Sequence, residues 1–360
     1  MKVTNRERIQ LQHEWWTRTN QAPLALIYTP LVYPYGGLDV GVAASQIAER
    51  KLANAEVAYT EPRDTLVTAY VDFATALIPA MLGAGFEWNK DTSWAIPTVD
   101  SILDLRIGPF DAGQPLFQAY IERVQAVLEH WTWDSYLPAT YAYLGPLDVL
   151  AGLLGPDRLA LELYGHPDHV KGLARELAYY LIDMANYELS LFRRAGIQNG
   201  TPCAFNYWLP GNGFLFSEDF CALVSRRHYA EFFLEPDIIF ARAVDSPFLH
   251  VHSLAAQCVP AILDNPYLRG IEISNDINNR DVRVVIEAAK KVQARALPLQ
   301  VSSWEHPLTQ DEIHLILSEL DPRGLLVALQ ARSIEEAGDL YELVTGRPYP
   351  GLPANPSAST

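Results

Sequence analysis

The chain has 360 residues, 49% hydrophobic and 19% charged, an ordinary globular composition that can bury a substantial core. Its 27 Lys and Arg residues against 43 Asp and Glu residues give a net charge of −16. Nucleic acids and anionic membranes attract clustered basic charge, so the composition argues against both as partners.

The cysteines and the N-terminal residues indicate the cellular compartment of the protein. The three cysteines, Cys203, Cys221 and Cys258, form no CxxC motif, so we expect neither a disulfide framework nor a cysteine-rich zinc site. The first residues are charged and lack the apolar stretch of a signal peptide, and no stretch is apolar enough to span a bilayer. We therefore expect a cytoplasmic protein.

The first half of the chain mixes predicted helices and strands. Helices are predicted at residues 5–19, 40–53, 64–82, 115–130 and 167–195. A strand is predicted at residues 23–30, which a proline limits at each end. A second strand is predicted at residues 137–144, because this stretch is rich in aromatic residues and ends at a Gly-Pro pair.

The second half alternates strands with helices. Strands are predicted at residues 213–217, 247–252, 270–274, 297–302 and 324–329, and helices at residues 218–244, 256–263, 280–294, 310–320 and 333–344. Each strand is nearly continuously apolar, which is typical of a strand covered on both faces. The alternation indicates right-handed β-α-β units and a parallel sheet.

These units predict an α/β protein of the (β/α)8 TIM barrel type. Roughly seven or eight units in a chain of this length fit a single-domain barrel over residues 1–349, with an N-terminal helical extension. The tail, residues 350–360, is predicted to be disordered. An open doubly wound sheet is the alternative, but no strand precedes the glycine fingerprint of a dinucleotide-binding fold.

Two histidines, His250 and His252, are the most informative residues of the chain. Side chains at positions i and i+2 of a strand point to the same face, so both imidazoles converge. Glu272 can point to the same place if residues 270–274 form the adjacent parallel strand. Imidazole and carboxylate ligands suit Zn²⁺ or a similar divalent ion, and either histidine could also act as a general acid or base. The alternative is a histidine packed in the barrel core.

Two further candidates follow predicted strands at their carboxyl ends, where barrel enzymes place their sites. Asp219 comes just after residues 213–217 and could orient substrate or accept a proton, or cap the next helix. Asn275 comes directly after residues 270–274 and could bind substrate or cap a helix.

Three tyrosines, Tyr28, Tyr33 and Tyr35, lie at the exit of the first strand. No Arg or Lys occurs between Arg18 and Arg50, so a substrate with many carboxylates finds no counter-charge in this loop. Aromatic rings suit a small apolar or aromatic ligand, or a methylated cation. We predict that the three tyrosines bind substrate, with core packing as the alternative for Tyr28.

Two segments resemble the uroporphyrinogen decarboxylase superfamily. Residues 143–170 contain a glycine–proline turn, a helix and a Leu-Tyr step into a long helix. Residues 219–236 are similar to the acidic residue and helix start of the family, with Arg226 and Arg227 in place of proline and glutamate. The resemblance covers nearly the whole chain and implies a (β/α)8 barrel. It also implies one of two chemistries: uroporphyrinogen decarboxylation, or zinc-dependent methyl transfer, often between a methylated corrinoid protein and a thiol.

The resemblance also bears on the site residues. The methyltransferases of the superfamily carry a His-x-Cys zinc motif on the strand that matches residues 247–252, and another cysteine later. In this chain His250 matches the histidine, His252 replaces the cysteine, and residues 324–330 supply no later cysteine. The decarboxylases hold their substrate with arginines in the loop after the first strand, and this loop has none.

Three functions are therefore considered. The first is a small-molecule methyltransferase in which His250, His252 and Glu272 bind zinc or activate substrate and Asp219 orients substrate or accepts a proton. A separate corrinoid protein would donate or accept the methyl group, and no covalently bound cofactor is expected. The second is a uroporphyrinogen decarboxylase-type carboxy-lyase, and the third is a non-catalytic ligand-binding barrel. The resemblance also implies a homodimer.

Overall fold

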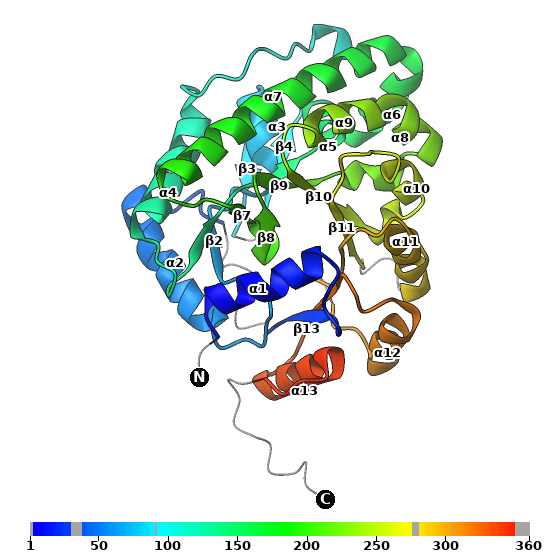
Figure 1. The fold of residues 1–360 in the computed structure, drawn as a ribbon. Helices are drawn as coiled ribbons and strands as arrows, with labels where there is room; N and C mark the ends of the chain where they lie inside the picture. Colours follow the sequence, from blue (N-terminus) through cyan, green and yellow to red (C-terminus); the bar gives the residue numbers. More distant parts are fainter. Residues whose placement is uncertain (1–2, 30–37, 91, 276–280, 305, 350–360) are drawn as a thin grey trace, which may run out of the picture.

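The computed structural model describes residues 3–29, 38–90, 92–275, 281–304 and 306–349. Its helices surround a parallel sheet (Figure 1). Tyr33, Tyr35 and the tail predicted to be disordered, residues 350–360, lie outside the described residues.

Thirteen strands are present in the described residues. They are β1 (Leu24–Tyr28), β2 (Thr68–Tyr70), β3 (Gly85–Trp88), β4 (Ser93–Ile96), β5 (Leu137–Ala139), β6 (Ala142–Leu144), β7 (Gly200–Cys203), β8 (Tyr207–Pro210), β9 (Gly213–Ser217), β10 (Ser246–His252), β11 (Gly270–Ser274), β12 (Leu299–Ser302) and β13 (Leu325–Gln330). Seven of them form one sheet in the order β1-β13-β12-β11-β10-β9-β6, and every pairing in this sheet is parallel.

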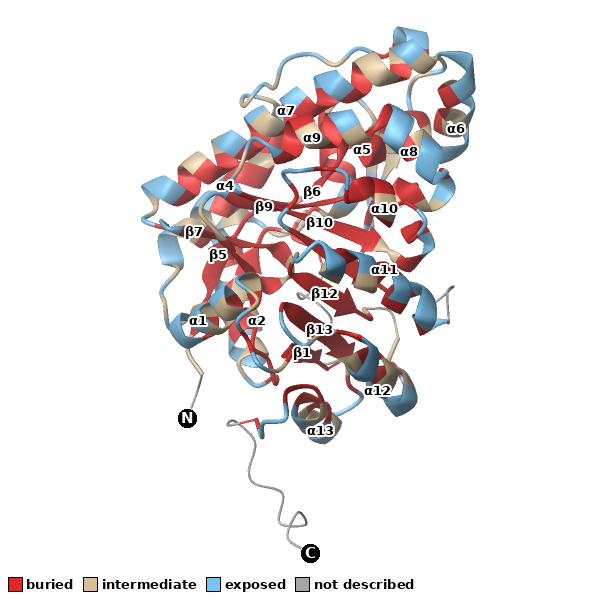
Figure 2. Ribbon diagram, turned by 45° about the vertical axis from the view of Figure 1, so that its right-hand side comes forward, coloured by how far each residue is buried: buried red, intermediate tan, exposed pale blue. Residues whose placement is uncertain are grey.

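The helices cover the outside of this sheet. They are α1 (Asn5–Trp16), α2 (Ala44–Ala58), α3 (Leu77–Met81), α4 (Pro115–His130), α5 (Pro146–Leu154), α6 (Pro156–Gly165), α7 (Pro167–Arg194), α8 (Arg226–Phe232), α9 (Leu234–Ala241), α10 (Val259–Ile262), α11 (Val282–Ala294), α12 (Gln310–Glu319) and α13 (Ile334–Thr345). Figure 2 shows buried strands inside and helices whose outer faces are exposed. No helix in the described ranges is both long and apolar enough to cross a membrane.

The predicted α/β fold with a parallel sheet is confirmed, whereas closure into an eight-stranded barrel is not seen among the described strands. β2 pairs with β5 in a separate two-stranded parallel sheet. No strand pairing joins β1 to β2 in the described residues, although the backbone N–H of Ile27 in β1 donates to the carbonyl of Pro62, which precedes β2. The short hairpins β3–β4 and β7–β8 are antiparallel additions that the sequence patterns did not reveal.

The helix predicted at residues 64–82 is wrong over most of its length. The three-residue strand β2 lies in its first half, followed by a 3₁₀ turn, η2 (Ala74–Ala76), and the short helix α3. Leu66, Val67, Ala69, Tyr70 and Val71 are all buried, so the stretch is covered on both faces, as in a parallel strand. A short, continuously apolar run does not distinguish a buried strand from a buried helix.

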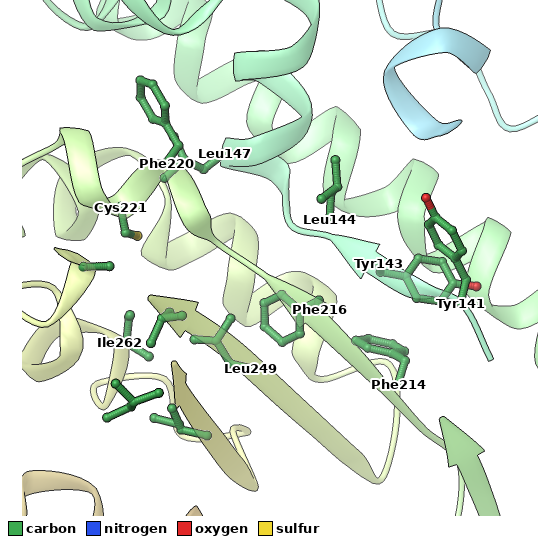
Figure 3. Close-up of a cluster of buried hydrophobic side chains, with 14 of the residues drawn as sticks. Tyr141, Tyr143, Leu144, Leu147, Phe214, Phe216, Phe220, Cys221, Leu249 and Ile262 are labelled. Carbon is green, nitrogen blue, oxygen red and sulfur yellow. The ribbon is translucent and has the colours of Figure 1, made fainter. Parts of the chain in front are cut away.

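Side chains of the large sheet alternate between two faces. Phe214 and Phe216 of β9 and Leu249 of β10 pack in the main hydrophobic cluster, together with helix residues such as Leu147 (Figure 3). The intervening residues point to the opposite, inner face, as the two-residue period of a strand requires.

Polar side chains gather on this inner face. Two rows cross neighbouring strands in register: Ser217, His250, Glu272 and Gln300 form one, and His252, Ser274 and Ser302 form the next. Polar groups inside a protein are costly unless they are hydrogen-bonded or face a cavity. The two rows therefore mark the place of a site.

Apolar side chains fill the inner face at the amino ends of the strands. Trp15 of α1 packs against Tyr207 and Phe248, with 5.8 Å between ring centroids in each pair, and all three are fully buried. The indole N–H of Trp15 donates to the carbonyl of Leu299 at the start of β12. The space that remains on this face thus lies toward the carboxyl ends.

Gly213, the first residue of β9, has no room for a side chain. An added Cβ would lie 2.7 Å from the backbone oxygen of Ser246 and 2.6 Å from Cβ of Leu209. We expect Gly213→Ala to lower the free energy of unfolding in urea by about 2–3 kcal/mol, because the sheet backbone cannot give way. The control is Gly41→Ala, where an added Cβ meets nothing within 4 Å. Equal stability of the two variants would contradict this packing.

Candidate active site

His250 and His252 lie on β10 and their rings converge on the inner face, as their spacing predicts. The two Nε2 atoms are 3.2 Å apart and the ring planes are perpendicular. His250 is 6% exposed, whereas 30% of the His252 side chain is exposed to solvent. The pair therefore links the buried interior to the solvent side of the site.

Asp219 joins the two histidines from the neighbouring strand. It begins the 3₁₀ helix η5 (Asp219–Leu223), two residues after β9. Its Oδ1 atom lies 3.5 Å from Nε2 of His252 and 3.8 Å from Nε2 of His250. This oxygen is shielded from solvent and accepts no hydrogen bond. These three residues are the group of ligand-type side chains that could hold a metal ion, within the part of the chain that the structure describes.

A buried carboxylate behind Asp219 fixes the turn that carries it. Asp148 of α5 accepts hydrogen bonds from the backbone N–H groups of Asp219 and Phe220, both at 2.8 Å, and from the hydroxyl of Ser217. Burial and the adjacent negative charge of Asp219 raise the pKa of Asp148 to about 8. No sequence pattern marked this residue, because it lies on a helix far from β9 in the chain.

Glu272 lies behind His250 on β11. Its Oε2 atom is 3.1 Å from Nδ1 of His250, on the opposite side of the ring from the Nε2 atom that faces His252. The carboxylate accepts hydrogen bonds from Tyr207, Gln300, Ser302 and Trp304. Burial raises the pKa of Glu272, but the neighbouring His250 and the hydrogen bonds outweigh it, so the pKa lies below its usual value.

The position of Glu272 suits an orienting role. A carboxylate at Nδ1 favours the imidazole tautomer that carries its proton there and leaves Nε2 free as a ligand or base. Glu272 is not in the group formed by Asp219, His250 and His252. Its assignment as a direct metal ligand stays a prediction.

The three residues face a pocket of about 1050 Å³ that is open to solvent. Aromatic residues line much of it, although the rings of two of them, Tyr141 and Tyr143, pack in the main hydrophobic cluster: Tyr70, Tyr141, Tyr143, Phe205 and Trp304. Phe205 stacks on the ring of His250 at 5.6 Å and lies 5.8 Å from Trp304. The site thus combines a polar cluster with an aromatic enclosure.

Phe205 and Asn206 hold an unusual backbone conformation beside the site. Their φ angles are 62° and 70°, in the left-handed region that bulky residues rarely adopt. Such strain costs of the order of 1–3 kcal/mol per residue and persists only where surrounding contacts impose it. Nothing in the local sequence predicts it, so Phe205 was missed as a site residue.

The remaining predicted site residues lie elsewhere. Tyr28 donates its hydroxyl hydrogen to the carbonyl of Ser303 and stacks on Trp304 at 5.1 Å. It lines a neighbouring pocket of about 540 Å³, which shares Tyr70 and Trp304 with the first. Asn275 is fully buried and is not among the described residues that line the pocket of His250.

A third buried carboxyl group, Glu188 of α7, supports Tyr141 and Tyr143 from behind. It accepts hydrogen bonds from the hydroxyls of Tyr120 and Tyr143 and from the backbone N–H of Tyr141. Burial raises the pKa of Glu188 to about 7, because these hydrogen bonds compensate only in part for the lost solvation.

No protein-family model and no curated protein matches the sequence. Eighteen chains of solved structures match the fold. One is a methyltransferase from Methanosarcina mazei, which is 13% identical, with a TM-score of 0.64 over 91% of this chain and 96% of that chain. The two proteins share a fold. At this identity the likeness extends to the α/β architecture alone, and the chemistry must be argued from the site.

Proposed function

We propose that the protein is a metal-assisted methyltransferase that acts on a small molecule. The observation that carries the proposal is the geometry of three ligand atoms, which are Nε2 of His250, Nε2 of His252 and Oδ1 of Asp219. Their separations of 3.2, 3.5 and 3.8 Å bracket the roughly 3.3–3.6 Å between ligands of a tetrahedral zinc ion with bonds of about 2.0–2.2 Å. The fourth position of such a site would face the solvent-open pocket.

The donor set fits zinc or a similar divalent ion. Two imidazoles and one carboxylate with an open position are typical of catalytic zinc sites. Metal binding would also give Oδ1 of Asp219, which is shielded from solvent and accepts no hydrogen bond, a binding partner. When bound, the ion would supply Lewis-acid activation of a group in its open position. Glu272 would hold the tautomer of His250, and the hydrogen bonds of Asp148 would hold Asp219 in reach.

Methyl transfer is favoured over decarboxylation of uroporphyrinogen by the wall of the pocket. Among the described lining residues there is no Arg or Lys to hold substrate carboxylates. The fold shared with a methyltransferase supports the same choice. A thiol or a separate corrinoid protein would exchange the methyl group, and a homodimer remains a prediction.

Metal retention tests the proposal directly. We expect the purified chain, loaded with zinc and passed through a desalting column, to retain about one zinc per chain by mass spectrometry, and His250→Ala and His252→Ala to retain almost none. His314→Ala, a replacement of an exposed histidine on α12, serves as the control. A wild-type protein that retains no more zinc than His250→Ala would overturn the metal site and leave the histidines as acid–base groups.

A further inference from the structure

The pocket of His250 is surrounded by negative charge. Its described wall contains two carboxylates, Asp72 and Asp219, and no Arg or Lys. A third carboxylate, Glu272, contacts the wall from behind at His250. A pocket with this lining raises the local concentration of cations and repels anions.

Lys51, which lines the neighbouring pocket of Tyr28, does not offset the negative charge of the His250 pocket. The ammonium group of Lys51 is 2.6 Å from Oδ2 of Asp39, and both side chains are buried. It lies 5.9 Å from the ring centroid of Tyr70. Because Asp39 already pairs with it, Lys51 adds little net positive charge to the pocket.

Asp72 supplies a carboxylate away from the proposed metal ligands. It follows β2 of the separate two-stranded sheet, whereas His250 is on β10 of the seven-stranded sheet. Asp72 accepts hydrogen bonds from the backbone N–H of Ala74 at 2.8 Å and the hydroxyl of Tyr70 at 3.1 Å. A bound divalent ion would be balanced by Asp219 and Glu272, so Asp72 would still favour a cation.

The aromatic rings specify which kind of cation the pocket would hold. Tyr70, Phe205 and Trp304 line the pocket with aromatic rings. Ring faces attract an alkylated ammonium, which cannot donate strong hydrogen bonds and carries its charge on its methyl groups. An inorganic cation or a primary amine would instead require several oxygen ligands.

We propose that the substrate is a small organic cation with N-methyl groups, a quaternary or tertiary ammonium; this assignment rests on the proposed methyl-transfer function. In the transfer from a quaternary ammonium, the bond from the methyl carbon to nitrogen breaks, and its electron pair stays on nitrogen. The methyl carbon bonds to the sulfur of a separately supplied thiolate. A neutral tertiary amine and a neutral thioether are the products, so atoms and charge balance.

Charge discrimination between two molecules of one shape tests the assignment. Choline and 3,3-dimethyl-1-butanol differ in that a carbon replaces the charged nitrogen. We expect isothermal titration calorimetry on metal-free protein to give a choline affinity at least about tenfold higher than that of the neutral alcohol. Equal affinities, or no binding of choline, would overturn the proposal.

An isosteric variant identifies the anionic group. We expect Asp72→Asn to weaken choline binding about fivefold or more and to leave zinc retention unchanged, with Asp104→Asn, an exposed acid, as the control. Unchanged choline affinity in Asp72→Asn would contradict the role of this carboxylate. Zinc retention without choline binding would overturn the cation assignment alone, and choline binding without zinc retention would overturn the metal site alone.

Discussion

Glu272→Ala is expected to lower the free energy of unfolding by roughly 3–5 kcal/mol, one of the largest effects of any single replacement in this chain. The side chain is fully buried, and its carboxylate accepts hydrogen bonds from four side chains, those of Tyr207, Gln300, Ser302 and Trp304. Alanine would leave these donors unsatisfied in a dry interior and would open a cavity. Urea denaturation at neutral pH measures the loss. Glu287→Ala, which removes an exposed carboxylate, should change stability by less than about 0.5 kcal/mol.

Glu272→Gln separates the chemical role of this residue from its structural one. The amide keeps the shape and part of the hydrogen bonding but removes the negative charge beside Nδ1 of His250. We expect zinc affinity to fall by roughly 10–100-fold, as for other carboxylates that orient a histidine ligand, with a smaller loss of stability than for alanine. A complete loss of zinc would instead indicate that Glu272 binds the ion directly, and an unchanged affinity would contradict both roles.

Stability is expected to fall as pH rises from about 4 to 8, because three buried carboxyl groups keep their protons in the native state over part of this range. Burial raises the pKa of Asp237 to about 6, of Glu188 to about 7 and of Asp148 to about 8. Between their ordinary and raised pKa values, the native state binds more protons than the unfolded chain does. The stabilisation from these groups is therefore complete below about pH 4 and is lost as pH rises through the native values.

Glu188→Gln is expected to flatten this pH dependence. For Glu188, the shift from 4.5 to about 7 corresponds to a loss on the order of 3 kcal/mol across the full range. Unfolding followed at pH 5.5 and pH 8 should give a larger difference for the wild type than for Glu188→Gln. Glu176→Gln, an exposed replacement on the same helix, should behave like the wild type. Parallel pH profiles for Glu188→Gln and the wild type would contradict the titration of Glu188.

The sequence predicted the second half of the fold well, because local pattern and tertiary burial agree there. The strands β9 to β13 and the helices α11 to α13 lie within two residues of their predicted limits. The failures lie before β9: the hairpins β3–β4 and β7–β8 were missed, and residues 64–82 form a buried strand, turns and the short helix α3. Their apolar run carries no period that separates strand from helix.

The candidate site was predictable in part. The two-residue period of a strand placed His250, His252 and Glu272 on one face, and the register of β10 and β11 agrees. The same period could not show that Glu272 lies behind His250 while Asp219 lies beside it. Trp304 and Phe205 were missed because their contacts join segments far apart in the chain and no motif marks them. The expectation of a methylated cation came from tyrosines in the first loop, whereas the described pocket supports it through other rings.

The packing of Trp15, Tyr207 and Phe248 at the amino ends of the strands has a kinetic consequence. Because these rings block the opposite end, a substrate and its product would both pass through the mouth of the described pocket at the carboxyl ends. A spent amine would then have to depart before a bulky methyl acceptor could reach the same atoms. The methyl donor and the methyl acceptor would therefore bind one after the other rather than together. Product release would then be a candidate for the rate-limiting step.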